Sequence, residues 1–352
     1  MLIWFNKVDS LSNLVLYSFE KILTGIKVKR VFSGIQPSGV IHIGNYLGAI
    51  KSWIKLTTQY ECIYCVVDYH ALTVGPDPKE LSRNILEAAK TLVACGLDSS
   101  NCTLFVQSEV PEHTELAWIL NTMTPVADLE RMTQYKDKRL QVRESVNSGL
   151  LTYPVLMASD IILYKAEVVP VGEDQQQHLE LTREIVRRFN RKYGEFFPEP
   201  EALIGEAPRI KGLDGNAKMS KSLNNYIALT EEEDEIWNKL KIAVTDPARK
   251  KRSDPGTPEI CNIYSLHRYF SDEDQIKYVA EGCRTAGIGC IDCKKTLAEN
   301  LNRTISPIRE RKKELDRDES IVRNILEEGR KRCSDIASTT MKEVRRLIGV
   351  IY

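Results

Sequence analysis

The sequence predicts an α/β fold in which a parallel-sheet domain is followed by a C-terminal helical domain. From Lys29 onward, short apolar segments typical of buried strands alternate with segments of helical periodicity. A turn containing glycine and proline follows the first of these segments. From about Leu223 the strand patterns fade and the helical periodicity continues alone. Strands that alternate with helices favour a parallel sheet covered on both faces, so we expect the first part of the chain to form such a sheet.

The individual elements follow from local composition. Apolar runs bounded by turn residues predict strands, and longer amphipathic or buried runs predict helices. The predicted strands are Arg30–Ile35, Cys62–Asp68, Thr103–Gln107 and Glu167–Val171. The predicted helices of this part are Asn45–Leu56, Lys79–Cys95, His113–Asn121, Tyr153–Tyr164 and Gln175–Asn190.

The chain of 352 residues is long enough for about two domains. We expect residues 1–28 to be an N-terminal extension outside the fold, either an appendage or the product of an unused upstream start codon, with a short amphipathic helix at Leu11–Leu23. Residues 29–222 would form the parallel-sheet domain and residues 223–352 the helical domain, whose last helix is a candidate to return to the first domain.

Composition limits the functions that the chain can serve. Lys+Arg and Asp+Glu both number 49, so the net charge is zero, and any contact with nucleic acid must use local basic patches. Such clusters occur in the helical part, at Arg249–Arg252, Arg309–Lys313, Arg330–Arg332 and Arg345–Arg346. No apolar run approaches the ~20 residues that span a bilayer, which predicts a protein without membrane association. No secretory signal pattern is evident, so we expect a reducing, cytoplasmic location.

The segment Gly39-Val40-Ile41-His42-Ile43-Gly44-Asn45 comes soon after the first predicted strand. A strand, a glycine turn and a helix start form a natural phosphate site, because backbone N–H groups and the helix dipole point at the anion. Gly44 leaves room for a flat base, and His42 and Asn45 can donate hydrogen bonds to phosphate oxygens. Taken alone, the segment could equally be an ordinary strand–helix turn.

A second segment, Lys218-Met219-Ser220-Lys221-Ser222, places two lysines three residues apart after the glycine-containing stretch 212–215. Such a loop can close and bring two cations onto a polyphosphate, which would neutralise charge on leaving pyrophosphate. Taken alone, it could equally be an exposed basic loop. The order of the two segments on a sheet of this type is much more specific than either segment.

Together the two segments resemble the HIGH and KMSKS signatures of class I aminoacyl-tRNA synthetases. The second is matched letter for letter, whereas Asn45 replaces the final histidine of the first, as in many bacterial tryptophanyl enzymes. Further segments are similar to the tryptophanyl branch of this family, and the resemblance extends from about Lys29 to the C-terminus. They are Phe32-Ser33-Gly34-Ile35-Gln36-Pro37-Ser38-Gly39, Val67-Asp68-Tyr69-His70-Ala71, Leu151-Thr152-Tyr153-Pro154-Val155-Leu156-Met157-Ala158-Ser159-Asp160 and Val169-Pro170-Val171-Gly172-Glu173-Asp174-Gln175. The resemblance implies a Rossmann-like fold for the first domain.

Asp160 lies inside an otherwise apolar predicted helix, where a carboxylate is costly unless it meets a donor. The resemblance implies that this donor is the indole N–H of tryptophan. The alternatives are a carboxylate on the helix surface or in a buried salt bridge. By the same resemblance, the residues that line the apolar slot are Phe32, His70, Met157, Val169 and Val171. His70 could also be a satisfied core histidine, and both valines would be core residues of a strand in any fold.

The resemblance assigns further residues to the substrates. Tyr153 and Gln175 would hold the α-amino group, and Gln36 would lie near the carboxylate and the α-phosphate. The residues expected to bind ATP are Gln36, Ser38, Gly44, Asn45, Lys138, Gly172, Asp174, Lys218, Met219, Ser220 and Lys221. Asp174 would reach the ribose. Lys138 would reach the triphosphate when the enzyme closes, unless it belongs only to a solvated charge run.

The implied reaction is that of a tryptophan–tRNA ligase. The tryptophan carboxylate attacks the α-phosphorus of ATP, pyrophosphate leaves, and the adenylate then transfers tryptophan to the 3′ end of tRNA(Trp). Positioning and charge stabilisation suffice for this chemistry, and His42, Asn45, Lys218 and Lys221 are the expected catalytic residues. Mg²⁺ would bridge the phosphates. The family is dimeric, so we expect a homodimer.

Four of the nine cysteines cluster as C-x21-C-x6-C-x2-C at Cys261, Cys283, Cys290 and Cys293. Four thiolates can hold a tetrahedral zinc ion or an iron–sulfur cluster. The spacing and flanking residues are similar to the subset of bacterial tryptophanyl enzymes that carries a [4Fe–4S] cluster, so we favour that cluster, with Zn²⁺ as the alternative. Cys62 and Cys65 would face opposite sides of a strand and serve as core residues.

Two other functions stay open at this stage. Within the enzymes, tyrosyl-tRNA synthetase is the nearest alternative, followed by nucleotidyltransferases that share the first signature. From another class, the chain could be a non-catalytic paralogue that binds RNA or senses redox state. The two intact lysines of the 218–222 loop argue against this last alternative.

Overall fold

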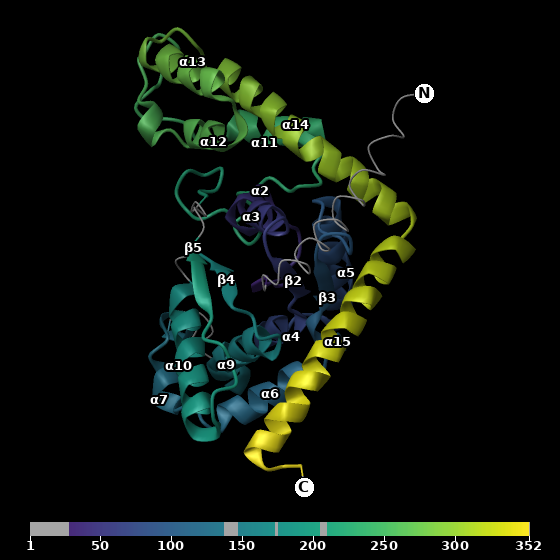
Figure 1. Ribbon diagram of the computed structural model, residues 1–352. Coiled ribbons are helices and arrows are strands. Elements are labelled where there is room, and N and C mark those ends of the chain that lie inside the picture. Colours follow the sequence, from purple (N-terminus) through teal and green to yellow (C-terminus); the bar gives the residue numbers. More distant parts are fainter. Residues whose placement is uncertain (1–27, 137–146, 173–174, 205–209, 352) are drawn as a thin grey trace.

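The computed structural model describes residues 28–136, 147–172, 175–204 and 210–351. Within these residues, five parallel strands form one sheet in the order β3-β2-β1-β4-β5 (Figure 1). The strands are β1 (Arg30–Ile35), β2 (Glu61–Val66), β3 (Thr103–Val106), β4 (Val168–Val171) and β5 (Glu201–Ile204). The predicted fold class, a Rossmann-like parallel sheet with a C-terminal helical domain, is confirmed.

Helices connect consecutive strands, as parallel pairing requires. Those of the sheet part are α2 (Ile43–Asn45), a π-helical turn (Tyr46–Ile50), α3 (Lys51–Leu56), α4 (Asp68–Ala71), α5 (Pro78–Ala94), α6 (Glu112–Asn121), α7 (Val126–Glu130), α9 (Ser148–Leu163) and α10 (Gln176–Tyr193). Short 3₁₀ turns lie at Leu72–Val74 and Gln107–Glu109. The helix predicted at Asn45–Leu56 therefore starts two residues earlier and contains a π-helical turn.

Both faces of the sheet are apolar, which explains the continuous hydrophobic strands. In β2, Cys62 and Tyr64 belong to the core on one face, and Ile63 and Cys65 to the core on the other. The prediction that Cys62 and Cys65 face opposite sides is thus confirmed. Residues of α3 and α5 fill the first core, and residues of α6, α9 and α10 fill the second.

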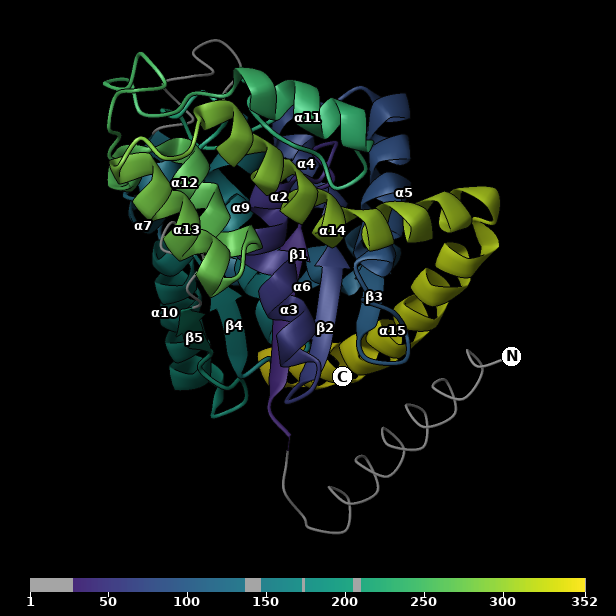
Figure 2. The same cartoon turned by 90° about the horizontal axis from the view of Figure 1, so that it is seen from above.

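The helical part consists of α11 (Glu233–Ile242), α12 (Asn262–Phe270), α13 (Glu273–Arg284), α14 (Cys290–Arg317) and α15 (Ser320–Ile348), with a 3₁₀ turn at Pro258–Ile260. Figure 1 shows α11–α14 gathered as a separate layer, while α15 runs back along the sheet. Seen from above, α15 lies beside β3 (Figure 2). The residue boundaries predicted for the two domains and for the extension stay predictions, and residues 1–27 lie outside the described part.

Helix α15 packs against β3 closely enough to restrict its own composition. A Cβ at Gly329 would lie 1.9 Å from the backbone oxygen of Leu104, a contact that no side chain can make. Cys333, Ala337 and Met341 of α15 are buried in the core that α6 and α9 also fill. The last helix therefore completes the core of the sheet. No helix among the described residues is both long and apolar enough to cross a membrane.

Candidate active site

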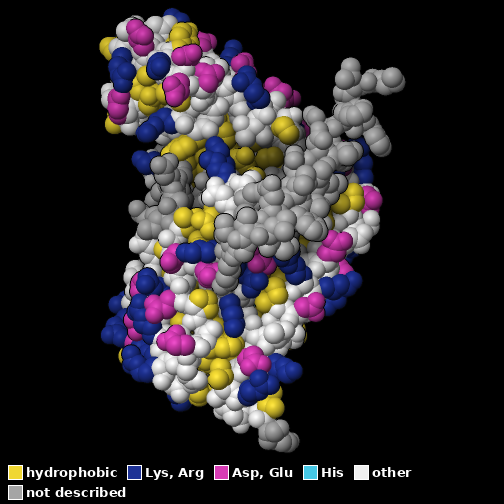
Figure 3. Space-filling model, in the orientation of Figure 1, with side chains coloured by type: hydrophobic (Ala, Val, Ile, Leu, Met, Phe, Trp, Pro, Cys, Tyr) yellow, Lys and Arg dark blue, Asp and Glu magenta, His cyan; other side chains and the backbone are white. Residues whose placement is uncertain are grey.

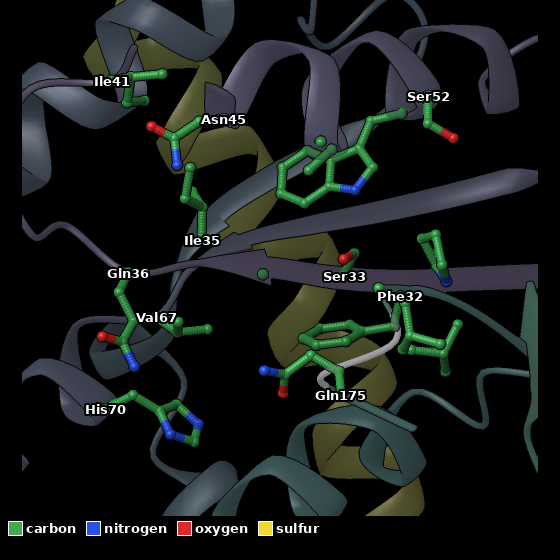
Figure 4. Close-up of a pocket in the computed structure, with 18 of the residues that line it drawn as sticks. Phe32, Ser33, Ile35, Gln36, Ile41, Asn45, Ser52, Val67, His70 and Gln175 are labelled. Atoms are coloured by element: carbon green, nitrogen blue, oxygen red, sulfur yellow. The ribbon is translucent and has the colours of Figure 1, made fainter. Parts of the chain in front are cut away.

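A pocket of about 870 Å³ opens at the carboxyl ends of the strands. Strand β1 is flanked by β2 and β4, and the chain passes to opposite sides of β1 to form them. This switch point is where open α/β sheets bind ligands. In Figure 4 the pocket reaches both sides of β1, with Ile41 and Asn45 on one side and His70 and Gln175 on the other.

The turn at His42 is a capping box. The His42 side chain accepts a hydrogen bond from the Gly44 backbone N–H through Nδ1 (3.1 Å), and Asn45 Oδ1 accepts one from the His42 N–H (3.1 Å). Because Nδ1 is an acceptor, the proton of the neutral imidazole resides on Nε2, and the amide N–H groups of Asn45 stay available as donors. Both predicted donors are thus held rigidly by the start of α2.

Burial and, to a smaller extent, the nearby charge of Lys218 lower the pKa of His42 to about 4. The imidazole is therefore neutral at physiological pH. A neutral ring donates through Nε2 without adding a charge, so the cations of this region are the lysines.

The 218–222 loop lies against the glycine turn, as the sequence predicted. A Cβ at Gly39 would be 2.4 Å from Lys221 Nζ, and one at Gly44 would be 3.5 Å from Met219 Cβ. Gly39 has φ +114°, a conformation that favours glycine. Lys218 lines the pocket with Asn45. Neither lysine has a carboxylate partner among the described residues, so both charges are available to an anion.

The apolar slot on the other side of β1 has the predicted lining. Phe32, Met157, Val169 and Val171 all border the pocket. Phe32 stacks on Tyr164, with ring centroids 5.6 Å apart and an interplanar angle of 12°, which fixes its ring. Flat, rigid apolar walls suit a planar aromatic ligand.

Asp160 of α9 is buried at the end of this slot and accepts three hydrogen bonds. Its Oδ2 faces His70 Nε2 at 2.7 Å, and its Oδ1 faces both Gln107 Nε2 and His113 Nδ1 at 2.7 Å. Burial alone would raise the pKa of Asp160, but hydrogen bonds from His113 and His70 outweigh it and hold the pKa below its usual range. The carboxylate is ionised, borders the pocket, and retains lone-pair capacity on Oδ2 for one further donor.

His70 and His113 both bind Asp160, a role that the sequence analysis assigned to neither. His70 is neither a plain core residue nor only a wall of the slot, because it lines the pocket and donates to Asp160. His113 was predicted only as the first residue of a helix. It is fully buried, and its Nε2 lies 2.7 Å from the Tyr164 hydroxyl, so it connects Asp160 to Tyr164.

Tyr153, Gln175 and Gln36, the residues expected around the amino-acid backbone, also line the pocket. The Tyr153 hydroxyl lies 2.9 Å from His178 Nε2 and 3.3 Å from Gln134 Oε1. Burial raises the pKa of Tyr153 to about 12, so its hydroxyl stays protonated. The group can therefore serve as both donor and acceptor.

The structure brings most predicted site residues to one cavity. The lining includes Phe32, Gln36, Ser38, Asn45, His70, Tyr153, Met157, Asp160, Val169, Val171, Gly172, Gln175 and Lys218. The pocket lining does not include His42, Gly44, Met219, Ser220 or Lys221, although Lys221 lies against Gly39 of the lining and Met219 lies close to Gly44. Lys138 and Asp174 lie outside the described residues, so their roles stay predictions. Sequence reasoning missed Gln107 and His113, although Gln107 directly follows a strand end, a position that could have indicated it.

The four clustered cysteines lie in one region of the helical part. Burial, and to a smaller extent the nearby Cys261, Cys283 and Cys290, raise the pKa of the Cys293 thiol to about 12. The buried Arg249 places Nη1 3.7 Å from Cys283 Sγ. No three His, Cys, Asp or Glu side chains in the described part of the chain are grouped so that they could hold a metal ion. The predicted metal site is therefore not supported by the arrangement of these thiols.

Most basic clusters of the helical part serve the fold. Arg309 is buried and contacts Glu232, Arg330 pairs with Glu327, and Arg345 pairs with Glu115. Figure 3 shows basic and acidic side chains intermixed over the visible face. Of the predicted run Arg249–Arg252, Arg249 is buried and donates to backbone carbonyls, whereas Lys250–Arg252 make no ion pair within the described residues.

These features define a class of α/β proteins that hold a polyphosphate between a glycine turn and a lysine loop, at the switch point of a parallel sheet. The chain belongs to the family of class I tRNA synthetases for tryptophan and tyrosine (W and Y), whose profile matches residues 27–306.

Within this family, the chain is similar over most of its length to proteins of the tryptophanyl branch. A tryptophan–tRNA ligase of Deinococcus radiodurans is 52% identical over 92% of this chain and 99% of its own length. A tryptophan–tRNA ligase of Thermotoga maritima is 45% identical over 92% of this chain and 100% of its own length. Among solved structures, the tryptophanyl-tRNA synthetase of Campylobacter jejuni, complexed with ADP and tryptophan, is similar with a TM-score of 0.83 and 37% identity, covering 91% of this chain and 99% of that one.

Proposed function

We propose that the protein activates L-tryptophan with ATP to tryptophanyl-adenylate and transfers tryptophan to the 3′ end of tRNA(Trp). The observation that carries this proposal is the meeting of the two signature segments: Lys221 lies against Gly39, and Lys218 and Asn45 border one cavity. Similarity to the tryptophan–tRNA ligases of two bacteria over nearly their whole lengths supports the same function.

The chain's own residues would act by positioning and by charge. His42 Nε2–H and the Asn45 amide are held as neutral donors by the capping box, and they would bind phosphate oxygens. Lys218 and Lys221 would stabilise the charge that develops on pyrophosphate as the bond to the α-phosphorus breaks. The attacking tryptophan carboxylate is already ionised, so no protein nucleophile is needed. Mg²⁺ would arrive on the phosphates of ATP, in keeping with its preference for phosphate and water oxygens.

Selection of tryptophan would rest on the slot and on Asp160. The carboxylate is ionised and surrounded by donors, so the acceptor capacity left on Oδ2 would receive the indole N–H. Phe32 and Met157 would cover the indole ring. A buried acceptor left unpaired by a smaller apolar side chain is costly, which would disfavour phenylalanine.

For the cysteine cluster, we propose a [4Fe–4S] cluster bound by Cys261, Cys283, Cys290 and Cys293, with zinc as the alternative. Burial and the nearby Cys261, Cys283 and Cys290 raise the pKa of Cys293, and the buried guanidinium of Arg249 lies beside Cys283, an arrangement that suits a centre with net negative charge. Binding would require the thiols to converge further than they do in this conformation. The centre would stiffen the helical part rather than take part in catalysis. Iron and sulfide analysis with a visible absorption spectrum on anaerobically purified protein tests this, and colourless protein containing zinc alone would reject the iron–sulfur assignment.

The helical part would bind tRNA, with Lys250–Arg252 as the basic segment free to contact phosphates, and the active protein would be a homodimer. Equilibrium sedimentation tests the oligomeric state.

The decisive experiment is ATP–pyrophosphate exchange with each amino acid in turn. Exchange that depends on tryptophan supports the proposal. Exchange with tyrosine alone would assign the chain to the tyrosyl branch, and exchange with neither would favour a non-catalytic paralogue.

A further inference from the structure

The base of the 218–222 loop is a compact set of hydrogen bonds. Asn225 is its centre: Oδ1 accepts from the Ser220 N–H (2.8 Å), and Nδ2 donates to Asp214 Oδ2 (2.8 Å). The Leu213 N–H donates to the Asn225 carbonyl (2.8 Å). A Cβ at Gly212 would lie 2.0 Å from Asn225 Nδ2, so the loop base has no room for a side chain there.

The helical part holds this base from outside. Asn262, the first residue of α12, donates from Nδ2 to the Gly212 carbonyl at 2.8 Å. The Val244 N–H, after α11, donates to the Leu213 carbonyl at 2.9 Å. Only 5% of Asn262 is exposed, so its amide is shielded from water. The side chain is therefore a direct bond between α12 and the segment that carries both lysines.

The same amide is only half satisfied. Asn262 Oδ1 is buried and has no hydrogen-bond partner in this conformation. An unpaired buried acceptor costs free energy, and such a group calls for an explanation beyond packing. The contact between α12 and the loop base therefore holds Asn262 at a cost that packing alone does not explain.

We propose that Asn262 is a positioning residue that transmits the position of the helical part to the Lys218–Lys221 loop. A displacement of α12 moves the Gly212 carbonyl, and the Asn225 network carries that shift to Ser220 between the lysines. This inference rests on the proposed function, because it assigns a role in the activation step. Misplacement of a catalytic cation by about 1 Å can cost a factor of ~100 in rate, so a single anchoring bond has kinetic weight.

The test compares two substitutions of Asn262 with a matched control. Asn262→Ala removes the donor, and Asn262→Leu removes it while keeping the same branched shape and number of side-chain heavy atoms. Asn300→Ala is the control, because Asn300 is also buried and bridges helices of the same part, donating to Ser271 Oγ and Gln275 Oε1, without touching the loop. We expect both Asn262 variants to lower kcat of tryptophan-dependent exchange by about 10-fold, the value of one buried hydrogen bond, with KM for tryptophan unchanged. Asn300→Ala should leave kcat within about 2-fold of the parent at a temperature where all variants are folded.

A second readout does not depend on activity. Lys218 and Lys221 are exposed, so trypsin can cut the loop, and bound ATP should protect it in the parent protein. The Asn262 variants should lose most of this protection, and Asn300→Ala should keep it. Parent-like kcat and parent-like protection in both Asn262 variants would overturn the inference. If the parent itself shows no tryptophan-dependent exchange, the proposed function fails instead, and the protection pattern alone decides whether Asn262 anchors the loop.

Discussion

At the scale of single residues, Asp160 shows how a buried carboxylate becomes a selective acceptor. Three donors from three different elements, His70, Gln107 and His113, converge on it. Each donor occupies a lone pair of the Asp160 carboxylate, and the lone-pair capacity that remains on Oδ2 can accept a hydrogen bond from the pocket. The acceptor that Asp160 presents to the pocket is therefore set in part by Gln107 and His113, which are not among the residues that line the pocket.

We predict that Asp160→Asn lowers kcat/KM for tryptophan by about 10- to 150-fold and leaves KM for ATP unchanged. The amide would lose the charge and turn N–H groups toward neighbours that also donate, and a hydrogen bond to a charged group contributes about 1.5–3 kcal/mol. Exchange kinetics measure the effect. Asp68→Asn is the control, because Asp68 is also buried and accepts from the Tyr69 and Ser108 N–H groups without lining the pocket. A parent-like kcat/KM in Asp160→Asn would exclude Asp160 as the indole acceptor.

A second residue-scale prediction concerns His42 and pH. Its folded pKa of about 4 lies below the value of about 6.5 expected when unfolded. Between these values the unfolded chain binds a proton that the folded chain does not, so this contribution to stability is present above pH 6.5 and is lost as pH falls toward 4. Urea unfolding from pH 4.5 to 8 should show that the stability difference between the parent and His42→Asn grows with pH over this window and is flat above it. A difference independent of pH would show that His42 is not buried as a neutral ring.

At the scale of elements, sequence patterns located strands better than helix boundaries. Strand β1 matched its prediction at both ends, because Arg30 and the Gln36–Gly39 turn bound it. Strand β5 was missed, since Glu201–Ile204 is short and directly follows Pro198 and Pro200, which are typical of a loop. The helix around Asp160 was predicted to begin at Tyr153, but α9 begins at Ser148 and includes Pro154 in its second turn, where proline removes one helical hydrogen bond.

The same limit applies to the site. Positions at strand ends and within motifs were identified because their spacing along the chain is informative. The convergence of His113 and Asp160, 47 residues apart, depends on how α6 packs against α9. No local pattern encodes that packing.

Elements α5 and α14 are joined by a buried charge cluster that allows a stability prediction. Lys90 of α5 is 4% exposed and contacts Glu87, Asp316 and Glu319 at 2.8–3.1 Å. Burial alone would lower the pKa of Lys90, but the hydrogen bonds that its ammonium donates to Glu319, Asp316 and Glu87 outweigh burial and raise the pKa, so the ammonium stays charged.

Lys90→Ala should lower the free energy of unfolding by about 2 kcal/mol, because it removes a buried cation that three carboxylates share and leaves only Lys312 and Arg323 to pair with them. Lys90→Met should lose less, since the aliphatic stem is kept. Lys313→Ala is the matched control, because Lys313 is 43% exposed and pairs with Glu232 and Glu310 at the surface, where such pairs contribute about 0–1 kcal/mol. Equal losses for Lys90→Ala and Lys313→Ala in chemical unfolding would contradict a structural role for the cluster.

At the scale of the whole molecule, the two ends of the described chain are joined through the sheet. Helix α15 follows the helical layer, yet its buried face belongs to the core beneath β3. Strand β3 runs directly into Gln107, one of the donors to Asp160. The last helix, the edge strand of the sheet and the apolar slot beside Asp160 therefore form one packed unit. A change on α15 should reach the site even though α15 contributes no residue to the pocket lining.

Gly329→Ala tests this connection. In an isolated helix the substitution would favour helicity by about 1 kcal/mol. Here the added Cβ would lie 1.9 Å from the Leu104 backbone oxygen and 2.7 Å from its carbonyl carbon, and a strand backbone held in a sheet cannot yield locally. We expect a net loss of about 1–3 kcal/mol in chemical unfolding and a raised KM for tryptophan, because β3 and Gln107 must shift. Ser338→Ala, on the exposed side of the same helix, should change neither quantity. A Gly329→Ala protein more stable than the parent would mean that α15 does not pack on β3 in solution, and the coupling of the last helix to the slot would be wrong.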